Sequence, residues 1–196
     1  MLMPTKKMLP DSGRPNIQRA AVLALLASHN VDVNTEKLFI LGLRGYYRDS
    51  MGKVGVNDID IYDDAIVIIT PTSMQAYNAN LDPTESKHPE GRPTTVCGEV
   101  FRAWKFALHH GKYPALCQRG GKWAVIREKT GRREDSDVLG INWHCGGNYS
   151  TGSEGCKTHP PAQWALAYAF AKNEAMRLYG KLTDVIVPYM ELEYHG

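Results

Sequence analysis

The sequence predicts an α+β protein that is mainly β, with one helix near the N-terminus and another near the C-terminus. Short runs rich in β-branched and aromatic residues, bounded by Gly, Pro, Asn and Asp, fill the middle of the chain and indicate strands. Helix-forming residues concentrate instead in two stretches, 17–28 and 162–179. At 196 residues, the chain is long enough for one domain with a sizeable core and too short for two comfortable ones.

The N-terminal stretch divides into an irregular segment and a helix. Residues 1–15 are punctuated by Pro, Lys and Gly, so we expect an irregular segment there and a single domain over 16–196. Asn16 is suited to cap the helix expected over 17–28, because its side chain can accept from the free N–H groups of the first turn.

The strands that follow are expected at short apolar runs separated by turn residues. Gly120-Gly121 is expected to join two of them in a hairpin, and the basic stretch 127–133 reads as a solvated hairpin tip. Residues 78–92 are polar and contain three turn-forming positions, which predicts a long surface loop. The expected strands are 39–43, a β-branched strand within 59–70, 74–77, 100–108, 115–119, 123–127 and 138–144.

The C-terminal helix has clear boundaries in the sequence. Pro160-Pro161 suits a first helical turn, where a missing N–H is tolerated, and Gly180 suits the end. Trp164 and Tyr168 lie at helical spacing and are expected to pack into the core. Residues 185–187 then lead to a last proline, Pro188.

Composition excludes several classes of function. A net charge of +2 gives no basic surface for nucleic acid or anionic membranes. No apolar run reaches the length of a membrane span, and no apolar region follows the N-terminal lysines as in a signal peptide. The four cysteines form no CxxC pair, so reduced thiols and synthesis in the cytoplasm are expected.

The most informative stretch runs from residue 141 to 158. His144 ends an apolar run, a loop rich in Gly, Ser and Thr follows, and the loop returns to Cys156 between Gly155 and Lys157. A thiol and an imidazole brought to hydrogen-bond distance form a nucleophile and its base. The loop glycines give freedom for a tight return, and their amides can face an oxyanion. The imidazole and the N-terminus of the helix near Pro160 are both expected to lower the pKa of Cys156.

This stretch resembles the signature of the L,D-transpeptidase catalytic domain, in which a strand ends in a histidine and a loop leads to Ser-His-Gly-Cys. Here Trp143-His144-Cys-Gly-Gly precedes Ser153-Glu-Gly-Cys156. The resemblance implies that Cys156 is the nucleophile, His144 the base and Ser153 the small hydroxyl residue, with the Gly155 and Cys156 amides at the oxyanion site. It also implies a β-sandwich or barrel core and no cofactor or metal.

The family acts on peptidoglycan stem peptides through a thioester, which passes its acyl group to an amine or to water. The motifs Gly-Leu-Arg-Gly-Tyr-Tyr, Tyr-Asp-Asp-Ala and Asn-Ala-Asn-Leu-Asp-Pro also resemble a bacteriophage- or prophage-encoded branch. Three departures stand out: Glu154 replaces the histidine of the motif, Thr158 replaces an arginine or asparagine, and only twelve positions separate His144 from Cys156.

Four further residues are candidates for binding the substrate. Tyr149 can donate a hydroxyl to the oxyanion or to a carboxylate, or simply pack in the loop. Arg44 and Arg119 can bind a stem-peptide carboxylate through two hydrogen bonds. His109 can line the substrate groove or orient His144, although the simpler interpretation is that His109 and His110 form a surface pair beside a turn.

Three other interpretations of the sequence stay open. His144, Cys145, Cys156 and His159 are zinc-type ligands, but adjacent residues of a strand face opposite ways, which disfavours one shared ion. A papain-like order would use Cys156 first and His195 as a later base. The pair Asp63-Asp64 resembles a carboxylate site but more often marks a turn.

The sequence therefore predicts a cysteine enzyme of peptidoglycan stem peptides, with hydrolysis favoured because no signal peptide accompanies the phage-like motifs. Cross-link formation by transpeptidation is one alternative. A phage structural or wall-binding protein that lost the chemistry is the other, motivated by Glu154 and Thr158.

Overall fold

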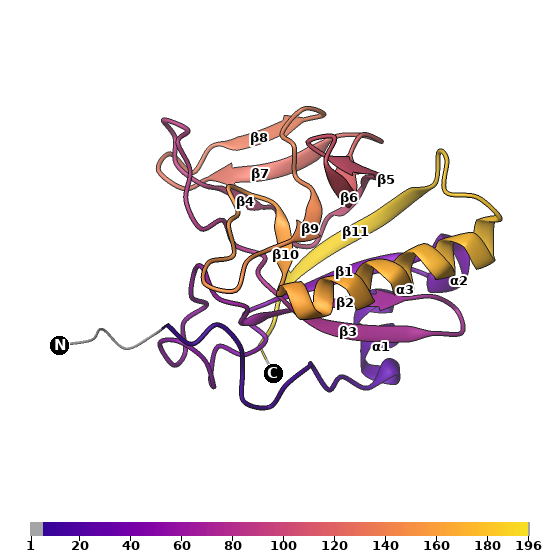
Figure 1. Ribbon diagram of the computed structural model, residues 1–196, viewed down its shortest axis with the longest axis horizontal. Coiled ribbons are helices and arrows are strands. Elements are labelled where there is room, and N and C mark those ends of the chain that lie inside the picture. The colour runs from indigo at the N-terminus through magenta and orange to yellow at the C-terminus, as the bar shows by residue number, and fades with distance from the viewer. Residues whose placement is uncertain (1–5, 196) are drawn as a thin grey trace.

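A computed structural model describes residues 6–195, and its main feature is one mixed sheet of eight strands (Figure 1). The spatial order of the strands is β10-β9-β6-β5-β11-β1-β2-β3. Their bounds are β1 Phe39–Arg44, β2 Asp64–Ile69, β3 Met74–Ala79, β5 Val100–His109, β6 Tyr113–Gln118, β9 Trp143–Cys145, β10 Lys157–His159 and β11 Ile186–Glu193.

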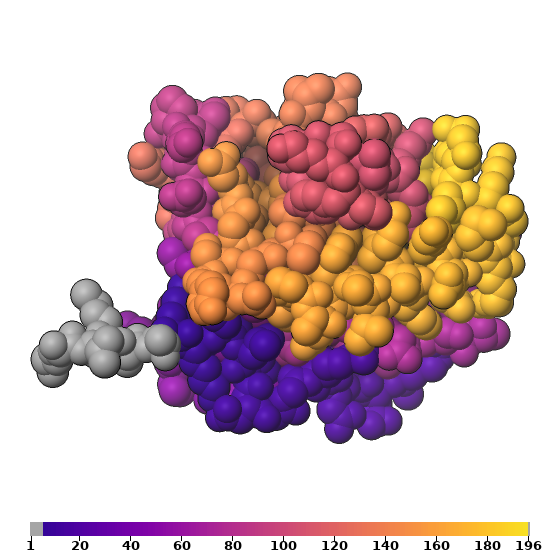
Figure 2. Space-filling view, viewed as in Figure 1, coloured from indigo at the N-terminus to yellow at the C-terminus, as the bar shows by residue number. Residues whose placement is uncertain are grey.

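The centre of this sheet is buried on both faces. β1 runs parallel to β11 and antiparallel to β2, and every residue of β1 and β2 is buried. Helix α3, Pro161–Tyr179, packs Trp164 and three alanines against one face, whereas α1, Arg19–Ser28, packs Val22 and Leu26 against the other. Figure 1 shows α3 crossing the strands of the large sheet, and Figure 2 shows its outer side forming part of the molecular surface.

A second sheet holds three short strands in the order β4-β7-β8: β4 Pro93–Thr95, β7 Trp123–Arg127 and β8 Arg133–Ser136. It joins the large sheet through stacked aromatic rings, because Trp123 lies 4.6 Å from Phe101, 5.1 Å from Trp104 and 5.2 Å from Tyr189, centroid to centroid. Burying four such rings contributes several kcal/mol of hydrophobic stabilisation. The second sheet is therefore fixed to the strands that carry the candidate site.

The two edges of the large sheet meet at one point. Asn80, just after β3, forms an antiparallel bridge with Thr158 of β10 through two backbone hydrogen bonds of 2.9 and 3.0 Å. The sheet is thus curled, and the strand that follows Cys156 lies at the seam.

Most of the expected elements are confirmed. The mixed, mostly sheet architecture is observed, the C-terminal helix begins at Pro161, and Gly180 ends it with a φ of 70°. Trp164 and Tyr168 pack against the core as expected, and residues 127–133 form the tip between β7 and β8. The N-terminal helix begins at Arg19, and Gln18 occupies its N-cap without a side-chain bond, so Asn16 does not cap it.

One expected hairpin and the length of one expected strand are wrong. Gly120-Gly121 does not close a hairpin, because β6 pairs with β5 and β9 whereas β7 pairs with β4 and β8. The expected strand over 138–144 is reduced to β9, which begins at Trp143; the Ile141 amide donates to the Gln118 side chain and not to the backbone of a neighbouring strand. A strand not expected at this length, β11, runs through Pro188 at an irregularity in its pairing with β5.

The N-terminal segment is irregular over the part that the structure describes, residues 6–18, and it packs on the domain. Arg14 donates to the carbonyl of Ala76 and lies over the Tyr77 ring at 4.0 Å. Residues 1–5 of the expected irregular segment lie outside the described part of the chain. Within residues 6–195 no helix combines the length and the apolar character that crossing a membrane requires.

Candidate active site

The candidate site lies on one face of four neighbouring strands. β9 and β10 run parallel, and their register sets Thr158 beside His144 and Lys157 beside Trp143. One step back along both strands, the Lys157 amide donates to the Asn142 carbonyl, which sets Cys156 beside Asn142. Side chains two positions apart on a strand share a face, so Cys156 lies diagonally across from His144, with about 8 Å between their Cα atoms.

The Cys156 thiol contacts backbone atoms of the neighbouring segment. It accepts from the Asn142 N–H at 3.4 Å and donates to the Gly140 carbonyl at 3.4 Å. The residue keeps part of its surface exposed, and the orange loop that leads to it reaches the surface in Figure 2. The thiol is thus held in place by backbone groups, in a residue that is partly exposed.

The electrostatics of Cys156 differ from the expectation. Burial raises the pKa of the thiol to about 11, and the Asn142 N–H and the Lys157 charge oppose this only in part. Strand β10 separates Cys156 from the start of α3 at Pro161, so the expected help from the helix N-terminus is wrong. The resting group is a thiol, and a base must take its proton during a reaction.

Ser153 and Gly155 shape the loop instead of facing an oxyanion. The Ser153 hydroxyl donates to the Cys156 carbonyl at 2.6 Å and accepts from the Gly155 N–H at 3.1 Å. Because the Gly155 N–H donates to the Ser153 hydroxyl, and that hydroxyl donates to the Cys156 carbonyl, neither group is free for an oxyanion. The expected oxyanion roles of Ser153 and of the Gly155 amide are therefore not supported. A Cβ at Gly155 would lie 2.9 Å from Pro93, so only glycine fits there. Within residues 6–195, the Cys156 N–H donates to no protein atom and remains the free amide at the thiol.

The ring of His144 is oriented by its own strand. It is 6 % exposed, and its Nδ1 lies 2.7 Å from the Cys145 carbonyl. A carbonyl only accepts, so Nδ1 carries the proton and Nε2 carries a lone pair. Burial lowers the pKa of His144, which keeps the ring neutral near pH 7. A neutral imidazole with a free Nε2 is what a general base requires.

The structure brings three more side chains to this face. His109 is buried, not a surface residue, and its ring stacks on His144 with centroids 4.1 Å apart. The Asn142 amide nitrogen lies 3.2 Å from His109 Nδ1, and the Tyr113 hydroxyl lies 3.3 Å from His144 Nδ1. Asn142 and Tyr113 carried no signal in the sequence, because strand pairing alone places them here.

The other three substrate-binding candidates, Tyr149, Arg119 and Arg44, differ in whether their side chains are free to contact a ligand. Tyr149 is 91 % exposed, so it does not pack in the loop and is free to contact a ligand. Arg119 is exposed and its guanidinium approaches only the Leu108 carbonyl, at 3.5 Å. Arg44 is wrong as a carboxylate-binding residue, because carboxylates of the protein already surround it.

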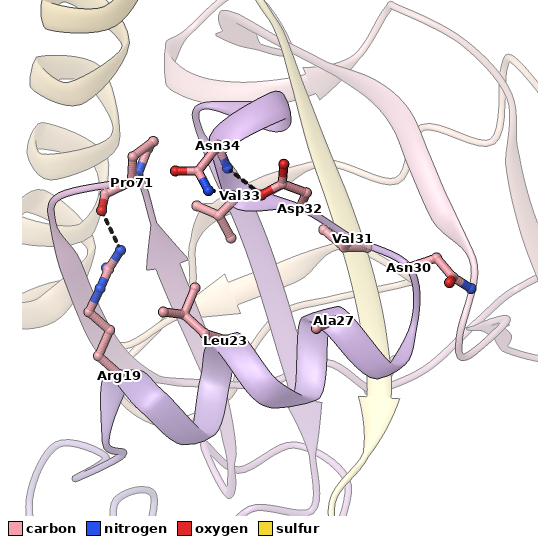
Figure 3. A pocket seen from close by; sticks show the side chains of 9 residues that line it. All are labelled: Arg19, Leu23, Ala27, Asn30, Val31, Asp32, Val33, Asn34 and Pro71. Atoms are coloured by element: carbon pink, nitrogen blue, oxygen red, sulfur yellow. Dashed lines mark hydrogen bonds between the residues drawn. The ribbon is translucent and has the colours of Figure 1, made fainter.

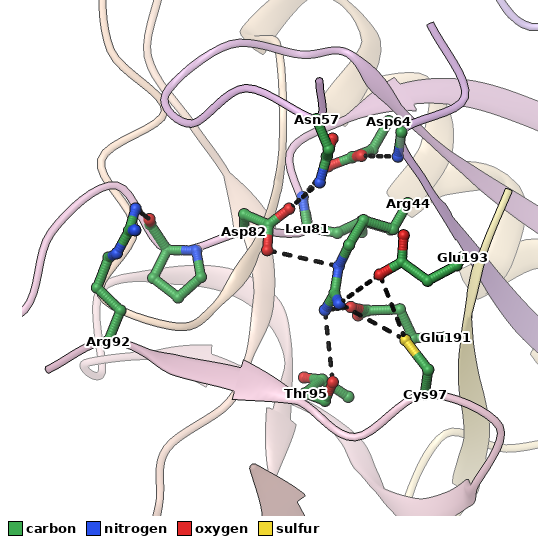
Figure 4. Close-up of polar contacts among 12 residues, drawn as sticks. Arg44, Asn57, Asp64, Leu81, Asp82, Arg92, Thr95, Cys97, Glu191 and Glu193 are labelled. Atoms are coloured by element: carbon green, nitrogen blue, oxygen red, sulfur yellow. Dashed lines mark hydrogen bonds and ion pairs between the residues drawn. The ribbon is translucent and has the colours of Figure 1, made fainter. Parts of the chain in front are cut away.

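Arg44 belongs to a buried charged network behind the site (Figure 4). Its guanidinium pairs with Asp82, Glu191 and Glu193. Glu191 also accepts from Lys157 at 2.7 Å, and Lys157, which is fully buried, donates to the Leu81 carbonyl at 2.6 Å. The residue directly after Cys156 is therefore anchored to β11 and to the segment after β3.

The pair Asp63-Asp64 is also buried in this region and does not mark an exposed turn. Asp64 accepts from the amides of Gly45 and Leu81 at 2.6 Å each, and Asp63 accepts from the Asp58 amide at 2.8 Å. Both side chains serve to hold backbone segments together. In residues 6–195, no three His, Cys, Asp or Glu side chains are grouped so as to hold a metal ion.

Two surface cavities in the described part of the chain lie away from the thiol. One, of about 530 Å³, is formed by α1, by α2 (Val33–Glu36) and by the turn at Pro71 (Figure 3). Arg19 lines this cavity, but its guanidinium already donates hydrogen bonds to the carbonyls of Thr70, Pro71 and Ser73. The other, of about 480 Å³, lies between β5, β6 and α3 and includes Arg119 and Tyr168.

Comparison with known proteins gives one partial similarity. The chain is 28 % identical over 118 residues to an adenosylmethionine-8-amino-7-oxononanoate aminotransferase from Anoxybacillus flavithermus (strain DSM 21510 / WK1), a match that covers 59 % of this chain and 25 % of that protein. The chain thus spans about a quarter of that relative's length. No protein-family model matches the chain.

Proposed function

We propose that this protein is a cysteine acyltransferase or peptidase with an L,D-transpeptidase-like core that acts on peptidoglycan stem peptides. One observation carries the proposal: Cys156 and His144 lie on the same face of two paired strands, with part of residue Cys156 exposed and the imidazole Nε2 free to accept a proton. The resemblance of the stretch 141–158 to the L,D-transpeptidase signature supplies the substrate class.

The reaction starts from a neutral pair. His144 Nε2 takes the thiol proton as sulfur attacks the carbonyl carbon of the stem peptide. The Cys156 N–H is the donor available to the oxyanion that forms. As the intermediate collapses, the C–N bond breaks, the leaving amine takes the proton from His144, and the acyl group stays on sulfur as a thioester.

The second half of the reaction decides between two activities. Water attacking the thioester gives a carboxylate and a shorter stem peptide, whereas an amine gives a new cross-link. In each case His144 takes a proton from the attacking group and returns it to sulfur. We favour hydrolysis, in a branch encoded by bacteriophages or prophages, because of the phage-like motifs in the sequence. Such an enzyme would be made in the cytoplasm and would act on the cell wall.

Purified peptidoglycan tests this proposal directly. Wild type is expected to release muropeptides with a new stem-peptide terminus or a new cross-link, and Cys156→Ala is expected to release none. Cys117→Ala is a matched control, because Cys117 is a buried thiol on β6, which is separated from β10 by β9. Identical muropeptide profiles for wild type and Cys156→Ala would favour the non-catalytic wall-binding alternative, which Glu154 and Thr158 motivate.

A further inference from the structure

Two stacked imidazoles underlie the face that carries the thiol. His109 ends β5 and lies opposite Tyr113 of β6, whereas His144 is the middle residue of β9. The rings are 4.1 Å apart with an interplanar angle of 25°, and both residues are less than a tenth exposed. Such a stack fixes the ring plane of His144, since each ring limits the rotation of the other.

Asn142 determines which nitrogen of His109 carries the proton. The Asn142 Oδ1 accepts from the Gln118 amide at 2.9 Å, which identifies its other amide atom as the NH₂ group. That group can only donate, so His109 Nδ1, 3.2 Å away, accepts and the proton of the neutral ring sits on Nε2. Asn142 also gives its backbone N–H to Cys156, so one residue holds both His109 and the thiol.

The surroundings disfavour a second positive charge on this face. Burial, together with His144 and His110, lowers the pKa of His109 to about 4. The titratable groups on the side of the two rings are His110 in the β5–β6 turn, Tyr113 and Cys117 on β6, and Cys156 just before β10. Cys145 of β9 and His159 of β10 are near in sequence register but lie on the opposite face, where His159 packs against Trp143 and Trp164. No carboxylate is among these groups to favour an imidazolium.

We propose that His109, held by Asn142, is a positioning residue that fixes the ring of His144 and keeps water from it, so that His144 Nε2 remains a neutral acceptor for the Cys156 proton. The inference rests on the proposed function for its kinetic consequences. His109 moves no proton itself. It acts through the ring on which it stacks.

The test compares three variants by the pH dependence of kcat/KM on peptidoglycan. His109→Ala removes the ring and admits water, so the acid limb should move up by about one pH unit and the rate should fall about tenfold or more. His109→Phe keeps a ring in the stack and should retain the wild-type acid limb with a smaller loss of rate. His29→Ala is the control, because His29 is exposed at the end of α1.

An NMR titration of His144 gives a readout that does not need turnover. In wild type the His144 signal should show the Nδ1–H tautomer and titrate below the ordinary histidine value of about 6.5, and His109→Ala should raise its pKa. The proposal is overturned if His109→Ala leaves the pKa of His144 unchanged, or if His109→Phe shifts it as far as His109→Ala does. A wild type that lacks Cys156-dependent turnover would contradict the proposed function instead, and the NMR result would still decide the role of His109.

Discussion

Cys156 has backbone partners for its thiol, a free amide N–H beside it and a neutral imidazole diagonally across the strand pair. This arrangement keeps Cys156 as a thiol at rest, so the reaction proposed for it depends on a base to take the thiol proton. It differs from sites in which a thiolate exists before the substrate binds, where a charged imidazole or a helix N-terminus holds the thiol pKa below neutrality.

The resting thiol leads to a prediction for chemical labelling. Without substrate, alkylation of Cys156 by iodoacetamide should be slow at pH 7 and should keep rising up to about pH 11, because burial raises the pKa of the thiol to about 11. Rates followed by mass spectrometry of the Cys156 peptide measure this. A rate that is already constant between pH 6 and pH 8 would show a resting thiolate and contradict the account.

The sequence predicts some residues of the candidate site and not others, for physical reasons. The proposed pair of Cys156 and His144 comes from residue type and from the glycine-rich loop between them, all within a short stretch. The role of Asn142 depends on strand register, which no local pattern reveals. The prediction for Arg44 was wrong because its partners Glu191 and Glu193 lie 147 and 149 positions away in sequence.

At the scale of elements, β10 fixes the position of Cys156, the residue directly before it, although the strand has only three residues. Paired edge strands of this length have little stability of their own. Lys157 supplies the missing anchor, since its buried ammonium binds Glu191 of β11 and the Leu81 carbonyl. The bridge between Asn80 and Thr158 adds a second attachment on the other side of β10.

Lys157→Met should therefore destabilise the protein strongly. The side chain has a similar length, but Glu191 loses one of its two cationic partners, and breaking a buried pair from one side typically costs about 3–5 kcal/mol. Urea denaturation followed by tryptophan fluorescence measures the change. Lys172→Met on the exposed side of α3 is the control and should change stability by less than about 0.5 kcal/mol. Equal stability of the two variants would show that the network does not anchor β10.

The sequence predicts an element correctly where the residues that define its start, end and buried face all lie within or next to that element. The helix over 161–179 has proline at its start, glycine at its end and an apolar face, so the sequence located it within a residue. The hairpin at Gly120-Gly121 failed because glycines indicate a change of direction and not a partner. The partners of β7 depend on tertiary contacts. Trp123 of β7 packs against Phe101 and Tyr189 of the large sheet, and β7 pairs with β4 and β8 in the second sheet. Strands as short as β9 and β10 show no period that a sequence pattern could reveal.

At the scale of the whole molecule, buried carboxylates outnumber buried cations near Arg44 and Lys157. Burial raises the pKa of Asp63 from 3.8 to about 7, with Asp82 and Asp58 adding to the rise. The folded protein therefore holds a proton that the unfolded chain releases above about pH 4, so this group's contribution to stability falls as pH rises toward 7. The buried histidines His109 and His159 act in the opposite direction, because burial lowers their pKa values to about 4 and about 3.

Comparing wild type with Asp63→Asn isolates the carboxylate, because the histidine contributions cancel. The free energy of unfolding of Asp63→Asn, relative to wild type, should rise by about 1–3 kcal/mol between pH 5 and pH 8. Urea denaturation at both pH values measures it, with the exposed Asp49→Asn as the control. A difference that does not change with pH would show that Asp63 is ionised in the folded protein at both values.

The central claim is that Cys156 forms a thioester with a stem peptide, and the mass of the intact protein tests this most directly. Wild type mixed with a purified stem tetrapeptide and quenched in acid should gain the mass of the acyl group, and digestion should place it on the Cys156 peptide. Cys156→Ala should gain no mass, whereas Cys117→Ala should gain the same mass as wild type. A wild type that never carries the acyl group while it converts the peptide, or an adduct on a thiol other than Cys156, would contradict the account.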